Sequence, residues 1–406
     1  MAKHRSETDE QIADLLRTAK ESLHLSVAFM TRMDGNTQFL EVVESSVPFL
    51  FKQGATQLQA TSLCQAIQDR RLPPVIPNLR DFPEAMKLPA ARMPRIRSYV
   101  SVPVLLSDGT MYGTFCAAGL VSDKGLTKRD KSLMDVLAHA AAVVIEPQVR
   151  ARARREEIAA RLRPVLEAGG PAVLLQPIVD LAGGVRVGAE ALSRFPVDWA
   201  MPPDVCFAEA HGIGEGHRLE LLALERAADH LERVLGYIAM NVSPDTLMTA
   251  ECTDLLAGMP LERILLELSE HAQVEDYDAL AAVLAPLRAR GMRLAIDDVG
   301  AGFSSLRHIV LTSPDVIKLD RSIVDGVCTD PVLTTLVRSL VDFGHGCDAL
   351  VVAEGVESAA DASALAALKV DFGQGWHFGR PGPPHDLTGY LPPAAQLHPA
   401  KAIAGT

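Results

Sequence analysis

Short apolar runs alternate with helical segments throughout the second half of the chain. The first two runs are separated only by Asp180-Leu-Ala-Gly-Gly184, which is too short for anything but a hairpin, so this pair is expected to be antiparallel. Most later gaps are long enough for a crossover helix, which makes the following strands parallel. The pattern predicts a closed α/β barrel with one reversed strand, with strands near 172–179, 185–192, 236–241, 263–268, 293–297, 315–319, 349–353 and 369–373.

The first third of the chain has amphipathic strand patterns instead. Two strands are predicted near 99–106 and 111–118, because Ser107-Asp108-Gly109 between them is a strong hairpin signal. Two more are predicted near 26–33 and 38–44. Helical patterns near 8–23, 61–70 and 127–145 flank these strands, so this part is predicted to be an α+β domain with a mixed or antiparallel sheet.

Residues 127–165 are rich in Ala, Leu, Val, Arg and Glu, with only Pro147 and Pro164 as helix breakers. They predict a long helix, kinked at Pro147, that joins two domains. A length of 406 residues also suggests two domains, each able to bury its own core. We therefore expect an N-terminal domain over 1–148, a helical linker over 149–165, a barrel over 166–395 and a C-terminal tail over 396–406.

Composition narrows the partners and the compartment. The net charge is −12 without a basic block, which argues against binding to a long nucleic acid or to a membrane surface. The charged N-terminus lacks the apolar core of a signal peptide, and no uninterrupted apolar segment approaches the roughly 20 residues needed to span a bilayer. The six cysteines are scattered without a Cys-x-x-Cys pair, so we expect reduced thiols, no structural zinc, no membrane insertion and a cytoplasmic location.

Twin aspartates, Asp297 and Asp298, follow one of the predicted barrel strands and precede a glycine-rich loop. Adjacent carboxylates repel each other and keep their charge at low cost only beside a cation, for which a divalent metal is the usual choice. The alternative is that the pair caps a helix or shapes a turn.

Other polar side chains follow the neighbouring strands: Glu190, Asn241, Glu267 with Glu270, Lys318 with Asp320, and Glu354 with Glu357. Taken singly, each could be a surface acid, a helix cap or half of a salt bridge. Because active-site residues of such barrels gather at the carboxyl ends of the strands, they are expected to share one rim. Oxygen ligands without Cys or clustered His suit Mg²⁺ or Mn²⁺, and an aspartate shared by two ions forms the kind of site that clamps a phosphoryl displacement.

The tripeptide Glu190-Ala191-Leu192, followed by Arg194, resembles the signature of the EAL-domain cyclic di-GMP phosphodiesterases. The resemblance continues in the same order to residue 381. It implies a TIM-like barrel and hydrolysis of cyclic di-GMP to linear pGpG. The matching segments are 176–178, 190–194, 241–244, 267–270, 297–306, 317–322, 353–357 and 374–381.

The resemblance also implies roles for individual residues. One metal ion would be held by Glu190, Asn241, Glu267 and Asp297, and the second by Asp297, Asp298 and Glu354. Lys318 would contact the attacking water, with Gln374 close to it. Glu354 would also belong to the catalytic group, and so would Glu270, which steadies the loop 299–305 in the family. Substrate contacts are expected from Gln176, Arg194, Asp320 and Glu357, the last in support. The resemblance also implies a homodimer. The two ions are expected to be Mg²⁺ or Mn²⁺, and Ca²⁺ should inhibit because it tolerates irregular, higher coordination and positions a water less tightly than Mg²⁺.

The chain departs from the family pattern at Val299, Ala301, Phe303 and Trp376, none of which removes a ligand. These changes therefore leave the rate of hydrolysis and its regulation more open than the ability to catalyse it. The main alternative to an enzyme is a non-catalytic receptor that binds the dinucleotide.

The N-terminal domain resembles a GAF sensor domain through residues 62–65, 99–103 and 113–116. Its ligand is not identified by the sequence, and it could instead be a dimerisation scaffold without a ligand. Cys64 and Cys116 suggest a chromophore or redox role, but buried structural thiols are the commoner outcome. His24 and His139 likewise could bind haem or be structural.

Overall fold

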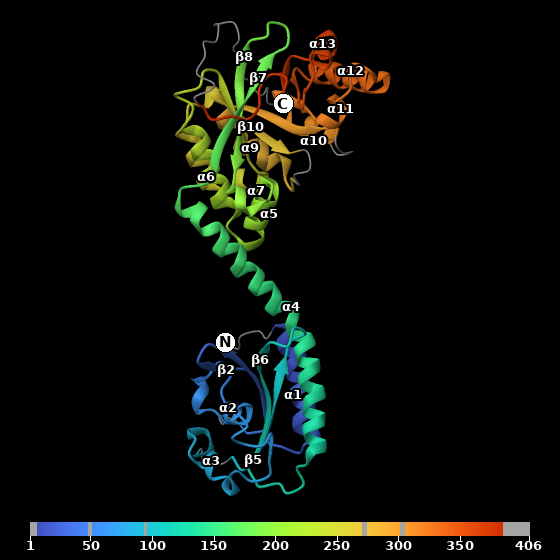
Figure 1. The fold of residues 1–406 in the computed structure, drawn as a ribbon. Coiled ribbons are helices and arrows are strands. Elements are labelled where there is room, and N and C mark those ends of the chain that lie inside the picture. The colour runs from blue at the N-terminus through green and yellow to red at the C-terminus, as the bar shows by residue number, and fades with distance from the viewer. Residues whose placement is uncertain (1–5, 48–50, 93–95, 270–273, 301–304, 385–406) are drawn as a thin grey trace. The chain divides into compact units, whose positions relative to one another are not determined.

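The computed structural model describes residues 6–47, 51–92, 96–269, 274–300 and 305–384 (Figure 1). The chain divides into two compact units, residues 1–154 and 155–406. Each unit contains one of the two predicted sheets.

The N-terminal unit is built on a six-stranded antiparallel sheet in the order β3-β2-β1-β6-β5-β4. Its four longer strands confirm the predicted ones. The edge strands β3 and β4 were not predicted, because three and two residues are too few to show an alternating pattern. The strands are β1 Val27–Asp34, β2 Thr37–Ser45, β3 Thr56–Leu58, β4 Val75–Ile76, β5 Ser98–Leu105 and β6 Met111–Gly119.

Helices α1 Glu7–Ser22, α2 Leu63–Gln68 and α3 Pro83–Met86 belong to the same unit. Helix α1 begins with a capping box, in which Ser6 accepts a hydrogen bond from the Asp9 amide and the Asp9 side chain accepts one from the Ser6 amide. Gly109 adopts a φ of +83° in the turn between β5 and β6, as the predicted hairpin requires.

Helix α4, Lys128–Glu167, continues without interruption through Pro147. It confirms the predicted long helix. Met134, Leu137, Ala141 and Ile145 are buried in the core of the N-terminal unit, at the spacing of one helix face. By length and composition alone, α4 is also apolar enough to cross a membrane, a property that the sequence analysis did not anticipate. This is weak evidence for a span, because a core helix meets the same criteria.

The second unit is a closed barrel of eight strands in the order β10-β11-β12-β13-β14-β7-β8-β9. Strand β7 is antiparallel to both of its neighbours, whereas the other adjacent pairs are parallel. The predicted barrel with one reversed strand is confirmed. The strands are β7 Ala172–Asp180, β8 Arg186–Arg194, β9 Tyr237–Asn241, β10 Ile264–Ser269, β11 Arg293–Val299, β12 Val316–Leu319, β13 Leu350–Ala353 and β14 Phe372–Gln374.

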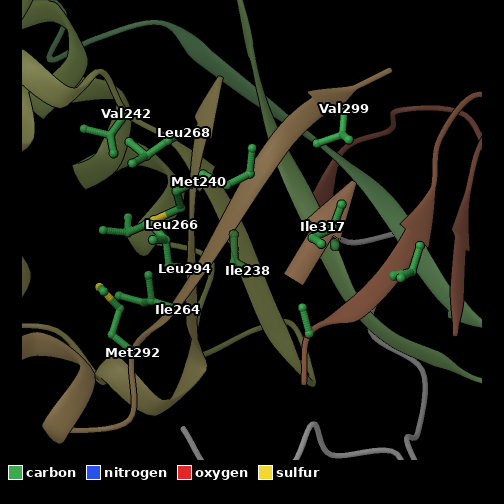
Figure 2. Packing of buried hydrophobic residues seen from close by; sticks show 14 of the residues in the cluster. Ile238, Met240, Val242, Ile264, Leu266, Leu268, Met292, Leu294, Val299 and Ile317 are labelled. Carbon is green, nitrogen blue, oxygen red and sulfur yellow. The ribbon is translucent and has the colours of Figure 1, made fainter. Parts of the chain in front are cut away.

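The helices of this unit bury apolar faces against the outside of the barrel. The outward-facing strand residues, among them Leu266 and Leu294, join helix residues such as Leu284 in one large buried cluster, part of which is shown in Figure 2. The helices are α5 Pro203–Ile213, α6 Gly216–Ala228, α7 Pro244–Leu247, α8 Ala250–Ala257, α9 Tyr277–Ala289, α10 Ser305–Thr312, α11 Arg321–Val324, α12 Pro331–Gly346 and α13 Ala359–Ala367.

The Leu294→Ala variant should lower the free energy of unfolding of the barrel by about 2–5 kcal/mol, because it leaves a cavity in this cluster. Urea unfolding followed by tryptophan fluorescence measures the change in the barrel alone, since Trp199 and Trp376, the two tryptophans of the chain, both belong to this unit. The exposed Val332→Ala control should stay within about 0.5 kcal/mol of wild type. Equal stability of the two variants would contradict the packing described.

Candidate metal and catalytic site

Glu267, Asp297 and Lys318 face the inside of the barrel because side chains alternate along a strand and the residues two positions earlier also face inward. Leu265, Ala295, Val316 and Val352, from four different strands, belong to one small apolar cluster. Two residues further along come Glu267, Asp297 and Lys318 on the same strands and Glu354 directly after the end of β13. The polar group is thus the next layer of side chains above a closed apolar layer.

Lys318 lies at the centre of this polar layer and has no exposed surface. Its Nζ atom is 2.6 Å from Glu354 Oε1, 2.8 Å from Glu267 Oε1 and 3.1 Å from Asp297 Oδ1. Glu190 Oε2 is 3.6 Å away. One ammonium therefore faces four carboxylates, and the group carries an excess of negative charge whenever all of them are ionised.

The environment shifts the proton affinities of this group upward. Burial, reinforced by the neighbouring acids, raises the pKa of Glu267 well above its ordinary value. Burial likewise raises the pKa of Asp297, and it raises the pKa of Glu354 to about 8. For Lys318, burial favours the neutral amine, but the surrounding carboxylates outweigh it and raise its pKa. The charge of these acids is costly without more cations than Lys318 provides.

Two sets of acids are close enough to hold divalent ions. Within each set, one oxygen from every member lies within 4.8 Å of the others. One set is Glu190, Glu267 and Asp297, and the other is Asp297, Asp298 and Glu354. Asp297 belongs to both sets, as a bridging ligand would.

Hydrogen bonding within the group also fits a metal site. Both carboxylate oxygens of Glu267 are buried; Oε1 faces the Lys318 ammonium over 2.8 Å, whereas Oε2 has no hydrogen-bond or ion-pair partner among the described residues. Buried polar atoms without partners are costly, and an all-oxygen donor set suits Mg²⁺ or Mn²⁺. The side chains present therefore fit divalent cations.

Two amide side chains orient Glu190. Gln374 Nε2 donates to Glu190 Oε2 over 2.6 Å and to Gln176 Oε1 over 3.2 Å. Asn241 Nδ2 donates to Glu190 Oε1 over 3.0 Å. Gly375 follows Gln374 with a φ of +153°, and a Cβ atom at this position would lie 2.2 Å from the Val356 carbonyl oxygen, so a side chain could not be accommodated there.

Asp298 adopts a φ of +61°, which is uncommon for any residue with a side chain. Its amide donates to Asp297 Oδ1 over 3.0 Å, so the backbone turns around the first aspartate. The turn-forming role considered for this pair is thus present together with the clustering of both carboxylates near Glu354. Such strained backbone is often found at functional sites.

The four predicted substrate contacts are placed differently from one another. Gln176 lies inside the site, where its Nε2 donates to the Gly379 carbonyl oxygen over 3.1 Å. Arg194 lines a cavity of about 350 Å³ that it shares with Asn241 and Glu267. Asp320 caps α11 by accepting the Ser322 amide, and Glu357 forms an ion pair of 3.0 Å with Arg321.

The other positions singled out in the sequence are Glu270 and the four departures from the family pattern. Glu270, Ala301 and Phe303 lie outside the described residues. Val299 is buried in the large cluster around the barrel, where an apolar side chain is suitable. Trp376 is half exposed, and Arg380 lies over its ring.

One residue that the sequence analysis missed also borders the cavity. Glu220 of α6 is buried, and its Oε2 accepts hydrogen bonds from the amide and the hydroxyl of Ser243, each over 2.9 Å. His211 contacts its other oxygen. Glu220 therefore fixes the segment that follows Asn241. In the sequence it lies inside a helix and not at the end of a strand, so no spacing singled it out.

Two family models match the chain. The model of the EAL domain matches residues 159–381, and a model of the GAF domain matches residues 6–146.

Curated relatives share the barrel region. An uncharacterized protein of Azorhizobium caulinodans is 33% identical over 261 residues, an alignment that covers 59% of this chain and 35% of that protein. "Probable cyclic di-GMP phosphodiesterase PdeN" of Escherichia coli strain K12 is 32% identical over 235 residues, covering 54% of this chain and 45% of that protein. The chain thus matches less than half the length of each of these two relatives.

The fold also matches a solved structure, that of the phosphodiesterase PaMucR in complex with c-di-GMP. The sequence identity is 27% and the TM-score 0.51, and the match covers 57% of this chain and 99% of that chain.

Mn²⁺ should raise the midpoint of thermal unfolding of the barrel by roughly 5–10 °C at a hundredfold excess over its dissociation constant, since binding at that level contributes about 2.7 kcal/mol. The rise should be larger at pH 8.5 than at pH 6, because metal binding requires ionised ligands and the pKa of Glu354 is raised to about 8. Differential scanning fluorimetry measures both effects.

The Asp297→Asn variant should lose most of this metal-dependent rise, whereas the exposed Asp278→Asn variant should keep it. An equal rise in the two variants would place the metal elsewhere.

Proposed function

Because this chain belongs to the EAL-domain family and carries a GAF domain ahead of that domain, we propose that it hydrolyses cyclic di-GMP to linear pGpG with the help of divalent metal ions. The observation that carries the proposal is the pair of acid sets that share Asp297 beside the buried ammonium of Lys318. The names of PdeN and of the PaMucR complex support the choice of substrate.

The metal ligands in this proposal are the two acid sets together with Asn241. When bound, two divalent ions neutralise charge at phosphorus and align the attacking and leaving oxygens. In the reaction, water attacks phosphorus in line, and the bond from phosphorus to the ribose 3′ oxygen breaks. The 3′ oxygen leaves and takes up a proton, which gives the linear dinucleotide.

Lys318 and Glu354 provide paired charges next to this reaction. The ammonium of Lys318 favours the deprotonated form of a water placed beside it and opposes build-up of negative charge. Glu354 contacts the Lys318 ammonium over 2.6 Å and so keeps that charge beside the metal ligands. Gln374 keeps the Glu190 carboxylate oriented through its 2.6 Å hydrogen bond.

Arg194 is the proposed phosphate contact. Its guanidinium uses one nitrogen, Nη1, to donate to the Ser193 carbonyl oxygen over 2.9 Å. A guanidinium has five N–H donors in a planar fork that matches a phosphate. Its position on the wall of the cavity, beside Asn241 and Glu267, would place the phosphate next to the metal ligands.

A receptor that binds cyclic di-GMP without hydrolysing it is the second candidate. The family fold and an intact phosphate contact would serve such a receptor equally well. Against it, every described metal-ligand position carries a competent oxygen donor, whereas a receptor has no need of all of them.

We further propose that the GAF domain regulates the activity, that the protein acts as a homodimer and that it is cytoplasmic.

Purified protein incubated with cyclic di-GMP and Mg²⁺ or Mn²⁺ should form pGpG, as seen by anion-exchange chromatography. Glu190→Ala and Asp297→Ala should each lower the rate at least about 100-fold, because loss of a group that only orients a metal ligand already costs roughly 10–100-fold and these residues are proposed ligands themselves. Ca²⁺ in place of Mg²⁺ should inhibit, since it accepts irregular coordination and positions a water less tightly.

Asp278→Ala removes an exposed aspartate of α9 and should leave the rate unchanged. Tight binding of cyclic di-GMP without product, measured by calorimetry on the same preparation, would favour the receptor instead.

A further inference from the structure

The N-terminal unit contains a pair of buried thiols outside the proposed catalytic site. Cys64 of α2 and Cys116 of β6 are 2% and 0% exposed, and their Sγ atoms are 3.5 Å apart. The two residues are separated by 52 positions in the sequence, so the fold brings them together.

The surroundings of the pair are polar although they are buried. The Tyr99 hydroxyl lies 3.1 Å from Cys64 Sγ. The hydroxyls of Ser101 and Thr114 lie 3.2 and 3.3 Å from Cys116 Sγ. Hydroxyl groups at this distance can stabilise a thiolate, whereas a purely apolar pocket disfavours one.

The two thiols differ in acidity. The hydrogen bond with Cys116 lowers the pKa of Cys64 to about 6, although burial acts in the opposite direction. Burial raises the pKa of Cys116. Cys252, buried in the barrel unit, has its pKa raised to about 12 and is a natural unreactive reference.

We propose that Cys64 and Cys116 are a redox-active dithiol that closes to an intramolecular disulfide when a hydroperoxide oxidises it. The Cys64 thiolate attacks a peroxide oxygen, so that an S–O bond forms and the O–O bond breaks. With hydrogen peroxide, the departing hydroxide takes up a proton and leaves as water, and Cys64 becomes a sulfenic acid. Cys116 then attacks the Cys64 sulfur, so that the S–S bond forms and the S–O bond breaks. The hydroxide released takes the Cys116 proton and leaves as a second water.

The geometry requires only a small movement. The sulfurs must approach from 3.5 Å to about 2.0 Å. Cys116 is held in the middle of the sheet, where it pairs with Phe29 of β1 and Ser101 of β5. Helix α2 has six residues and lies outside the sheet, so closure would draw α2 toward the sheet.

Closure would also change the contacts of Tyr99. Its buried hydroxyl faces Cys64 in the reduced form, and a disulfide sulfur no longer has a proton to donate. Strand β5, which carries Tyr99, leads into the turn where the Ser107 hydroxyl donates to Glu146 of α4 over 2.5 Å. Oxidation at the pair would therefore act on the strand that contacts the long helix.

The full-length Cys328→Ser/Cys347→Ser variant is the protein to test, because these two cysteines are exposed and would react first. After treatment with hydrogen peroxide, alkylation of the unfolded protein should find two thiols fewer than before. Peptide mapping should join Cys64 to Cys116 and leave Cys206 and Cys252 free. Dithiothreitol should restore all four thiols.

In the Cys116→Ser form of this variant, a 1,3-dione reagent should trap Cys64 as a sulfenic acid. Wild-type protein treated in parallel shows, through Cys328 and Cys347, that the oxidant was active. The contradicting result is full alkylation of Cys64 and Cys116 in the peroxide-treated Cys328→Ser/Cys347→Ser variant, while Cys328 and Cys347 of the wild type have reacted. This result would overturn the proposal even if the Cys116→Ser form did not fold. These readouts do not involve cyclic di-GMP, so the test is independent of the proposed function.

Discussion

The barrel depends on the pairing of one buried ammonium with several buried carboxylates. An unpaired charge at the position of Lys318 would be strongly destabilising, and so would the carboxylates around it if Lys318 were absent. Contacts of 2.6–3.1 Å to Glu354, Glu267 and Asp297 make the arrangement tolerable, but they leave the acids in excess. The raised pKa values of these acids are the consequence, and additional cations relieve the excess charge. The same interaction thus explains the architecture of the site and why its acids fit divalent metals.

Much of this arrangement follows from the sequence. The eight apolar runs predicted the number of barrel strands, and the five-residue segment 180–184 predicted the reversed strand. Because parallel strands end at one rim, the acids that follow them were expected to meet. Three of the four ligands predicted for the first metal, Glu190, Glu267 and Asp297, form the first acid set. The second predicted set also lies together.

Other features could not be predicted, for physical reasons. Strands β3 and β4 are too short to have a pattern of their own, and they exist because neighbouring strands offer hydrogen bonds. The role of Glu220 depends on the packing of α6 against the segment after Asn241. The approach of Cys64 to Cys116 is likewise a tertiary contact, between residues whose local sequences give no sign of each other. Both units therefore place ionisable groups in their interiors, where only the complete fold defines the neighbours.

The central claim is that Asp297 bridges two divalent ions, one in each acid set. The most direct test is anomalous X-ray diffraction from crystals of the full-length protein grown with Mn²⁺. Two anomalous peaks about 3.5–4 Å apart, on either side of the Asp297 carboxylate, are the predicted result. A single peak, or peaks away from Asp297, would contradict the claim.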